Sequence, residues 1–266
     1  MNKKSEENAM QLSTEDRRAR IAAKIHEHGK IKVSELSEEY NTSEVTIRKD
    51  LEALEAQGQL KRVHGGAVGL NKLYIDMDLS ERYMTNSGAK KTLAELASEF
   101  VEDNDTIFMN AGTTLTYVLR AIRNKKNINL VTNSVQNATE AALYPSFNVI
   151  LLGGELDSKY QFTHGTDAER QLENYHAAKC ILSVDGISAN AGLTLYYSNE
   201  APLARKMIES SSKTIVVADS TKIGKGVFAR ITDASKTDFL VTNPSENKKE
   251  LLALQKLGVK IYTTDD

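Results

Sequence analysis

The sequence predicts an α/β chain in which a small helical module precedes a larger domain built on a mostly parallel sheet. Two patterns predict this fold class. Segments with helical spacing of apolar residues occupy the beginning of the chain, and strand-length apolar runs alternate with amphipathic segments further on. The length of 266 residues allows two domains, and contents of 40% hydrophobic and 26% charged residues are typical of a globular protein.

Three helices are expected in the N-terminal module. The first covers residues 15–28 and the second residues 34–40, with Ser34 as its cap. The third begins after Ser43, a favourable N-cap residue, and ends at Gly58. Only three or four residues separate the second helix from the third, which is the turn length of a helix-turn-helix.

The third helix of a helix-turn-helix presents the exposed residues of its first turns to DNA bases. The sequence 60–68 then predicts a short basic hairpin, because two glycines permit a tight reversal. The candidate DNA-binding residues are Ser43, Thr46, Arg48, Lys49, Lys61, Arg62, His64 and Gly65. Lys and Arg are balanced by Asp and Glu over residues 1–68, so a three-helix scaffold that binds protein remains an alternative at this point.

Residues 33–68 resemble the signature of the DeoR family of bacterial transcriptional regulators. The motifs are a Val-x-x-Leu second helix, a Ser-x-x-Thr-Ile-Arg-x-Asp-Leu third helix and a Gly-x-Leu-x-Arg-x-His-Gly-Gly-Ala hairpin. The resemblance implies a winged helix-turn-helix that binds double-stranded operator DNA. It assigns Thr46, Arg48 and Asp50 to the reading helix, and Arg62, His64, Gly65 and Gly66 to the wing.

The larger domain is expected over residues 88–266, with the module at 13–68 and a connection at 69–87, which has no sustained period. Its strands are expected at 106–110, 127–133, 148–154, 179–186, 213–220, 238–243 and 259–264. Amphipathic helices are expected between most of them. Open sheets of this kind bind ligands beyond the carboxyl ends of their strands.

Small and polar residues gather at those predicted strand ends. They are Asn110, Gly112, Thr113, Thr114, Thr132, Asn133, Ser134, Gly153, Gly154, Asp185, Gly186 and Lys222. Free N–H groups at a helix start near 112–114, with Lys222, suit a phosphate, and the polar side chains suit sugar hydroxyls. The five His residues show no metal-ligand spacing, so neither a metal nor a cofactor is expected.

The resemblance to the DeoR family extends to this domain, which in the family is similar to ribose-5-phosphate isomerase and is retained as a sensor. Its motifs include Glu-Arg-Tyr at 81–83, Lys90, Asn-Ala-Gly-Thr-Thr at 110–114, Glu200 and Asp-Ser-Thr-Lys at 219–222. The resemblance thereby adds Lys90 and Glu200 to the candidate effector-binding residues. Asn110 stands where the family usually has Asp, which removes a potential general base.

The expected function is that of a DNA-binding repressor of a carbohydrate catabolic operon, released by a phosphorylated sugar. A homodimer or homotetramer is expected, because such proteins bind paired half-sites. The alternatives are a sugar-phosphate isomerase with a DNA-binding module, an activator, and a regulator with another phosphorylated ligand. A polar N-terminus, apolar runs too short for a bilayer and a lone cysteine indicate a cytoplasmic protein without a membrane partner.

Overall fold

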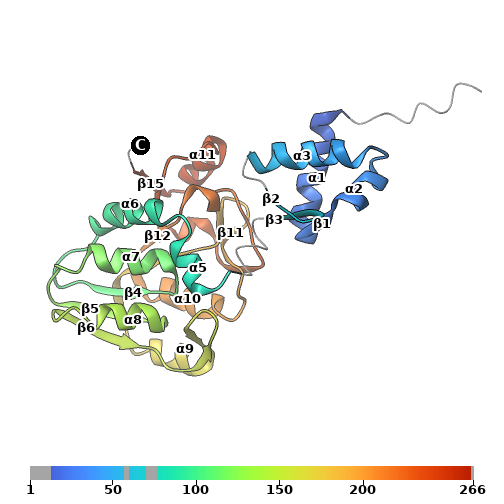
Figure 1. The fold of residues 1–266 in the computed structure, drawn as a ribbon. Helices are drawn as coiled ribbons and strands as arrows, with labels where there is room; N and C mark the ends of the chain where they lie inside the picture. The colour runs from blue at the N-terminus through green and yellow to red at the C-terminus, as the bar shows by residue number, and fades with distance from the viewer. Residues whose placement is uncertain (1–12, 57–59, 70–76, 265–266) are drawn as a thin grey trace, which may run out of the picture. The chain divides into compact units, whose positions relative to one another are not determined.

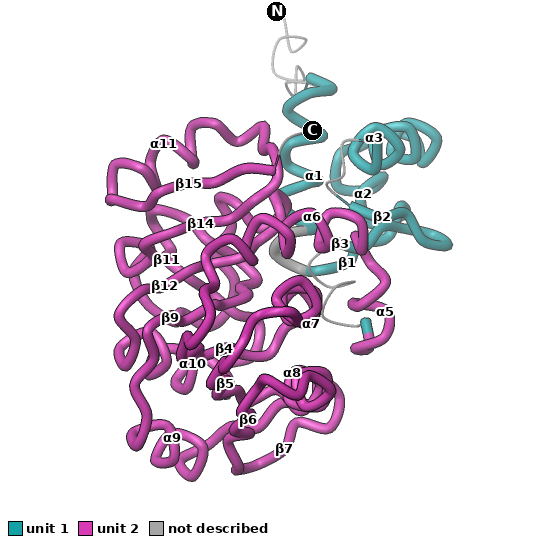
Figure 2. The backbone as a smooth tube through the Cα atoms, turned by 90° about the vertical axis from the view of Figure 1, so that its left-hand side faces the viewer, with its two compact units in different colours: residues 1–77 teal, residues 78–266 magenta. Residues whose placement is uncertain are grey.

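The computed structural model describes residues 13–56, 60–69 and 77–264, and the chain divides into two compact units, residues 1–77 and 78–266 (Figure 1, Figure 2). The expected helix end at Gly58 and most of the expected connection lie outside the described residues. No helix in the described part of the chain is long and apolar enough to cross a membrane.

The first unit is a three-helix module with a small sheet. Its elements are α1 (Thr14–His28), β1 (Lys30–Lys32), α2 (Val33–Glu39), α3 (Glu44–Ala56), β2 (Leu60–Val63) and β3 (Gly66–Gly69). Ile21, Leu36, Ile47 and Leu51 are buried together, so the apolar stripes of all three helices meet in one core.

Two details of this unit differ from the sequence expectation. Helix α2 begins at Val33 with Lys32 at the cap position, so Ser34 lies inside the first turn and is not the cap. Strand β1 was not predicted, because three residues carry too little pattern. It pairs with β3, which makes the hairpin β2–β3 part of a sheet with the order β1-β3-β2.

The second unit is an α/β domain around a seven-stranded parallel sheet with the order β15-β14-β12-β9-β4-β5-β6 (Figure 1). Its strands are β4 (Thr106–Met109), β5 (Ile128–Thr132), β6 (Phe147–Leu151), β9 (Ala177–Leu182), β12 (Ser211–Val217), β14 (Phe239–Thr242) and β15 (Lys260–Thr263). The mostly parallel sheet that the sequence predicted is confirmed.

Helices cover both faces of this sheet. They are α5 (Leu79–Met84), α6 (Ser87–Ser98), α7 (Thr113–Ala121), α8 (Val135–Ala141), α9 (Thr166–Leu172), α10 (Ala201–Glu209) and α11 (Lys248–Lys256). Successive side chains of β4 point to opposite faces of the sheet and pack into two separate cores. Phe108 belongs to the core that contains α9 and α10, whereas Ile107 and Met109 belong to the core that contains α6 and α7. Burial on both faces explains why the strands read as continuous apolar runs.

The strand order reverses between β4 and β9. From β4 the chain continues outward through β5 and β6, returns to β9 on the other side of β4, and then continues through β12, β14 and β15. In open α/β sheets the crevice at the carboxyl ends of two such strands is the usual ligand site. The topology therefore directs attention to the residues that follow β4 and β9.

Several small elements were not predicted from the sequence. Helix α5 lies within the segment 69–87 that was expected to be a connection, and it belongs to the second unit. Strands β7 (Glu155–Asp157) and β8 (Phe162–His164) form a hairpin, and β10 (Gly186–Ser188), β11 (Gly192–Leu195) and β13 (Ala229–Thr232) form an antiparallel sheet. Two short 3₁₀ helices, η1 (Ser220–Lys222) and η2 (Ala234–Lys236), complete the second unit.

Candidate functional site

The start of helix α3 combines a cap with exposed cations. The hydroxyl of Ser43 accepts a hydrogen bond of 3.2 Å from the backbone N–H of Thr46, so Ser43 caps the helix as expected. Arg48 and Lys49 are exposed on the following turn. Arg48 forms an ion pair of 3.0 Å with Glu44, but an exposed pair of this kind contributes little to stability and leaves the guanidinium accessible to another partner.

Asp50, the acidic residue of the reading-helix motif, has a structural position. Only 2% of its surface is exposed, and its two carboxylate oxygens accept hydrogen bonds from Arg17 Nε (2.6 Å) and Arg18 Nε (2.9 Å). These charge-assisted bonds tie α3 to α1 and fix the orientation of the helix that carries Arg48 and Lys49.

The hairpin β2–β3 presents a basic edge. Lys61, Arg62 and His64 are exposed, and Arg62 Nε donates a bond of 2.7 Å to Glu55 of α3. Gly65 has a φ of +77°, which the reversal requires. A Cβ atom at Gly66 would lie 2.2 Å from the carbonyl oxygen of Ile31, so glycine permits the close approach of β1.

In the second unit, Asn110 bridges the ends of β4 and β9. Its Nδ2 atom donates bonds of 3.0 Å to the carbonyl oxygen of Ser183 and to Oε1 of Glu200, and its Oδ1 atom accepts a bond of 2.9 Å from the N–H of Ser183. Its carbonyl oxygen accepts a bond from Asn137. Both amide hydrogens are therefore used inside the protein, so Asn110 spans the crevice between the two strands.

Glu200 is a buried carboxyl at the start of α10. Its surface is 4% exposed, and burial raises its pKa to about 8, with a further increase from the nearby charge of Asp185. Asn110 opposes this increase through its hydrogen bond. Near neutral pH, Glu200 is therefore mainly protonated and can donate a hydrogen bond.

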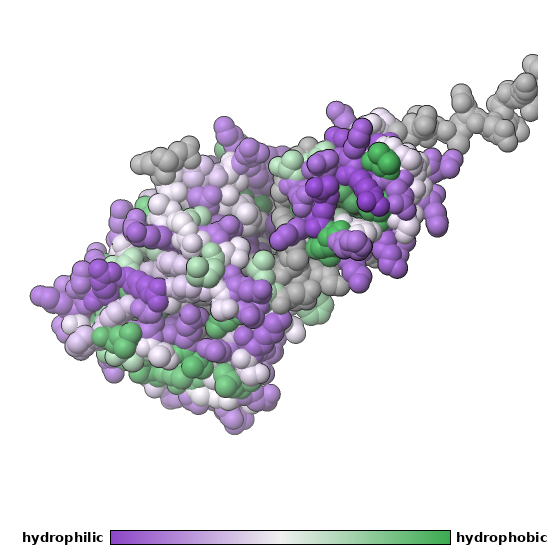
Figure 3. All heavy atoms as spheres, in the orientation of Figure 1, coloured by the Kyte–Doolittle hydropathy of each residue, from purple (hydrophilic) through white to green (hydrophobic). Residues whose placement is uncertain are grey.

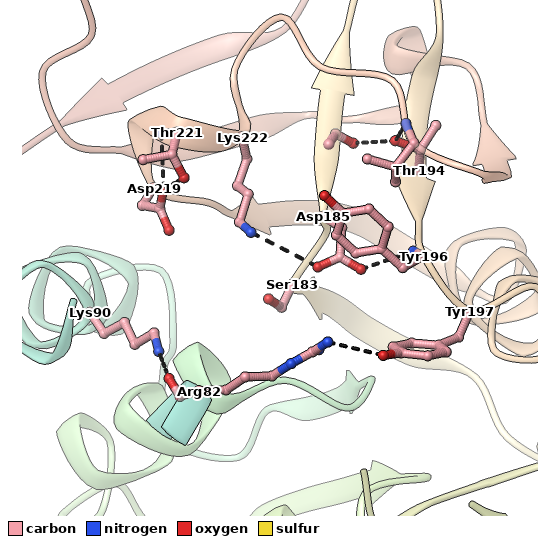
Figure 4. Close-up of polar contacts among 12 residues, drawn as sticks. Arg82, Lys90, Ser183, Asp185, Thr194, Tyr196, Tyr197, Asp219, Thr221 and Lys222 are labelled. Atoms are coloured by element: carbon pink, nitrogen blue, oxygen red, sulfur yellow. Dashed lines mark hydrogen bonds and ion pairs between the residues drawn. The ribbon is translucent and has the colours of Figure 1, made fainter. Parts of the chain in front are cut away.

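Asp185 and Lys222 face each other across the ends of β9 and β12. Lys222 Nζ lies 4.0 Å from Asp185 Oδ1, and Asp185 Oδ2 accepts a bond of 3.0 Å from the N–H of Tyr196 (Figure 4). The carboxylate is thus oriented by a backbone group as well as by a cation.

Three cations from different elements extend toward this part of the sheet, namely Arg82 of α5, Lys90 of α6 and Lys222 of η1 (Figure 4). Burial lowers the pKa of Lys90 to about 8; Asp219 acts in the opposite direction, while Lys222 and Arg82 add to the lowering. Such a concentration of like charge stabilises a bound anion.

A helix start adds backbone donors near the same crevice. Helix α7 follows β4 after the short loop 110–112, and the first N–H groups of a helix have no partner within it. A Cβ atom at Gly112 would lie 2.6 Å from Ser183 Cβ, so glycine lets this loop approach the end of β9. Thr113 and Thr114 follow as buried residues of the first turn.

The predicted residues beyond β5 and β6 have mostly local partners. Thr132 and Ser134 serve the turn and cap of α8, since Ser134 N–H bonds to Thr132 Oγ1 and Ser134 Oγ accepts from Asn137 N–H. Asn133 donates to the carbonyl oxygen of Thr163, but its buried Oδ1 accepts no hydrogen bond in the described part of the chain.

The remaining predicted glycines shape turns. Gly153 N–H bonds to Gln171, and a Cβ atom at Gly154 would lie 2.5 Å from the carbonyl oxygen of His164. At Gly186 a Cβ atom would lie 2.6 Å from the carbonyl oxygen of Lys225. These glycines maintain the backbone beyond the ends of β6 and β9 and offer no side chain to a ligand.

Sequence reasoning did not select Arg82 and its aromatic partners as site residues. Arg82 is 7% exposed, donates a bond of 3.0 Å to the Tyr197 hydroxyl, and lies 4.3 Å from the centre of the Tyr160 ring. The Glu-Arg-Tyr motif was the available signal for Arg82. The tyrosines come from distant segments and follow no recognisable pattern.

Within the described residues, no group of three or more His, Cys, Asp or Glu side chains could hold a metal ion. The chemistry that the arrangement offers is recognition of an anion that also carries hydroxyl groups. Cations suit the anion, and carboxyl and amide oxygens suit the hydroxyls.

Comparison with known proteins gives matches in both units. A family model described as the DeoR-like helix-turn-helix domain matches residues 17–72, and one described as the DeoR C terminal sensor domain matches residues 85–244. Together they cover most of the chain, and the sensor match contains the crevice between β4 and β9.

Full-length relatives carry the names of regulators. The HTH-type transcriptional regulator YulB of Bacillus subtilis (strain 168) is 35% identical over 246 residues, covering 92% of this chain and 95% of the relative. The lactose phosphotransferase system repressor of Streptococcus mutans is 33% identical over 250 residues, covering 93% and 97%. The HTH-type transcriptional repressor GlcR of Bacillus subtilis (strain 168) is 28% identical over 251 residues, covering 94% and 96%.

Among solved structures, ribose 5 phosphate isomerase A from Neisseria gonorrhoeae is similar with a TM-score of 0.38 and 20% identity, covering 50% of this chain and 52% of the isomerase. At that level the likeness gives no information on ligand or activity.

Proposed function

The chain belongs to the DeoR family of transcriptional regulators, and we propose that it represses a carbohydrate operon and is released from its operator DNA by a phosphorylated sugar. Two of the three relatives described above are named as repressors, one of them of a lactose phosphotransferase system. Arg48, Lys49, Lys61, Arg62 and His64 form the proposed DNA-binding surface of the first unit. As a regulator of operator DNA, it would act in the bacterial cytoplasm.

The observation that carries the effector class is the combination of cations and carboxyl groups at the sheet crevice. Arg82, Lys90 and Lys222 suit a phosphate group, and a dianion would offset their mutual repulsion. Asp185 and the protonated Glu200 can accept from and donate to hydroxyl groups. A phosphate alone would use the cations only, so the carboxyls favour a hydroxylated phosphate ester.

Helix α5 suggests how effector binding is transmitted to the DNA-binding unit. Arg82 follows Met77, the last residue of the first unit, by only five positions and extends toward the crevice. An effector that pairs with Arg82 would act on the segment that leads directly to the DNA-binding unit. Release then requires only that the effector prefer the conformation with low operator affinity, typically by about 1–3 kcal/mol.

The proposal is tested by a mobility-shift assay on the DNA upstream of the protein's own gene. Sugar phosphates are titrated into the complex, with the matching free sugars and inorganic phosphate as controls. We expect release by one sugar phosphate and by neither control. Retention of the complex with every sugar phosphate would contradict the effector class.

Two variants separate the two proposed sites. We expect Arg48→Ala to lose specific operator binding while it retains sugar-phosphate binding by calorimetry. We expect Lys222→Met to bind the operator like the unmodified chain but to resist release. Operator binding that is unchanged in Arg48→Ala would contradict the placement of the DNA-binding surface.

A further inference from the structure

Helix α3 carries an apolar side chain on the side that faces away from the core. Ile47, Leu51 and Leu54 are buried within the first unit, whereas 64% of the surface of Val45 is exposed. A helix turns by about 100° per residue, so Val45 lies nearly opposite these three side chains. Val45 therefore points outward, away from the residues that stabilise the first unit.

Cations lie beside Val45 on this exposed face. Arg48 and Lys49 follow it by three and four positions, which places them next to it on the following turn, and both are exposed. Figure 3 shows a green, apolar area beside purple, hydrophilic atoms over the part of the first unit that Figure 1 labels α3. An anionic partner held by the two cations would therefore also contact Val45.

Two glutamates occupy exposed positions of the same helix, and each lies close to a guanidinium group. Glu44 Oε2 is 3.0 Å from Arg48 Nη2, and Glu52 Oε1 is 3.9 Å from Arg62 Nη2. The guanidinium groups screen these carboxylates, which lowers their repulsion of an anionic partner.

The direction of the Val45 side chain is fixed by its own stiffness and by the anchoring of α3. Asp50, on the buried side of the helix, accepts bonds of 2.6 Å and 2.9 Å from Arg17 and Arg18 of α1. A valine in a helix has one strongly preferred χ1 rotamer. The two methyl groups of Val45 are thus held in place before a partner binds, so contact with them costs little conformational entropy.

We propose that Val45 recognises a thymine of the operator by contact with its C5 methyl group, an inference that rests on the proposed DNA-binding function of α3. The first residues of the reading helix in a helix-turn-helix contact base edges in the major groove. The thymine methyl group is the apolar feature of those edges, and apolar side chains are its usual partners. Val45 has neither a donor nor an acceptor on its side chain, so it suits this feature alone.

The surroundings of Val45 favour DNA over a protein partner. Protein partners bind contiguous apolar surface. Among the described residues of the first unit, the other exposed large apolar side chain is Val63, which is 46% exposed. Val63 lies in the wing, whose Arg62 contacts Glu55 near the opposite end of α3 from Val45. An isolated apolar side chain beside cations matches a methyl group next to a phosphate backbone.

The test uses uracil, which differs from thymine only by the missing C5 methyl group. A duplex that the full chain binds is first selected from a random DNA pool, and each thymine is then replaced singly by uracil. Fluorescence anisotropy measures the affinity of the unmodified chain, of Val45→Ala and of the matched control Val63→Ala for each duplex. Alanine has a higher helix propensity than valine, so Val45→Ala keeps α3 intact.

We expect uracil at one thymine position of each half-site to weaken binding by the unmodified chain about fourfold, as for the loss of one buried methyl-sized group. Val45→Ala should bind the thymine and uracil duplexes equally, because its contact with the methyl group is already lost. Val63→Ala should keep the fourfold difference, because Val63 lies outside the reading helix.

Two results would overturn the inference and leave the proposed function intact. One is a selected duplex in which no uracil weakens binding by the unmodified chain. The other is an equal loss from uracil in the unmodified chain and in Val45→Ala, because another side chain would then contact the methyl group. If no sequence can be selected from the pool, the proposed DNA-binding function is itself contradicted, and the inference with it.

Discussion

The side-chain amide of Asn110 donates a hydrogen bond of 3.0 Å to Glu200, so a neutral group holds a buried carboxyl at the point where the strand order reverses. The same amide donates to the carbonyl oxygen of Ser183 on the other side of the crevice. Asn110 therefore has a positioning role, and its amide hydrogens are not free for a sugar. An asparagine at position 110 thus satisfies the buried carbonyl oxygen of Ser183 and the carboxyl group of Glu200 at the same time.

Asn110→Asp tests this role. The carboxyl group cannot donate both hydrogen bonds, and near Glu200 it introduces a second acid in a buried place. We expect the free energy of unfolding to fall by about 1–3 kcal/mol, as for a buried acceptor that loses its donor. Urea unfolding measures it. The exposed Asn190→Asp is the control, and equal effects of the two changes would contradict a positioning role for Asn110.

Glu200→Gln is expected to change how stability depends on pH. The pKa of Glu200 is about 8 in the folded chain and near 4.5 when unfolded, so between these values the folded state holds a proton that the unfolded state has released. This group therefore makes unfolding easier as pH rises from about 4.5 to about 8, by on the order of 1 kcal/mol per pH unit. The Gln variant lacks this cost. Its free energy of unfolding, relative to that of the unmodified chain, should therefore increase from about pH 4.5 to about pH 8 and stay constant above pH 8.

Denaturation curves from pH 5 to pH 9 provide the measurement. The control is Glu173→Gln. The Lys206 hydrogen bond lowers the pKa of Glu173 below its ordinary 4.5, so this group titrates below the measured range and the control should differ from the unmodified chain by a nearly constant amount. A constant difference between Glu200→Gln and the unmodified chain across the range would show that Glu200 ionises normally.

The fold was largely predictable from the sequence, because burial on both sides leaves each strand as a continuous apolar run, such as 106–109, and each helix with one apolar stripe. The candidate site was predictable only in part. Lys222, Asp185 and Asn110 stand at strand ends, where sequence position indicates the edge of the sheet. Which residues meet across that edge depends on strand order, which no local pattern specifies. Arg82 was missed as a site residue because α5 is a single short helix whose burial comes from tertiary contacts.

Lys90 should make effector affinity depend on pH. Its pKa of about 8 means that the ammonium group loses its proton at a pH where an ordinary lysine is still charged. We expect affinity for the releasing sugar phosphate to fall as pH rises above about 8. In Lys90→Met, affinity at pH 7 should be lower by about tenfold, as for a lost charge-assisted bond. The decline in affinity above pH 8 should become shallower, and the part that remains comes from Glu200, whose pKa is also about 8. Calorimetric titration measures both, and Lys91→Met, which changes an exposed lysine of the same helix, should behave like the unmodified chain.

Asp50→Asn should destabilise the DNA-binding unit without removing a DNA contact. The change weakens the bonds to Arg17 and Arg18 that tie α3 to α1, with an expected cost of about 1–3 kcal/mol. Hydrogen exchange of the α1 and α3 amides in the full chain measures this cost. Lys49→Ala, on the same helix but exposed, should leave exchange nearly unchanged and weaken operator binding. If Asp50→Asn instead left hydrogen exchange unchanged and weakened operator binding, Asp50 would have to contact DNA.

The two glycines of the hairpin should respond differently to alanine. At Gly66 a Cβ atom would meet the carbonyl oxygen of Ile31 at 2.2 Å, and only a separation of β1 from β3 can relieve the contact. At Gly65 no atom of the described residues would lie within 4 Å of an added Cβ atom, so alanine there costs only its strained left-handed conformation, about 1 kcal/mol. We expect Gly66→Ala to lose most operator affinity and Gly65→Ala to keep most of it, as measured by fluorescence anisotropy with labelled operator DNA. Equal losses would indicate that the hairpin contacts DNA through the Gly65 backbone itself, because a conformational cost alone cannot produce them.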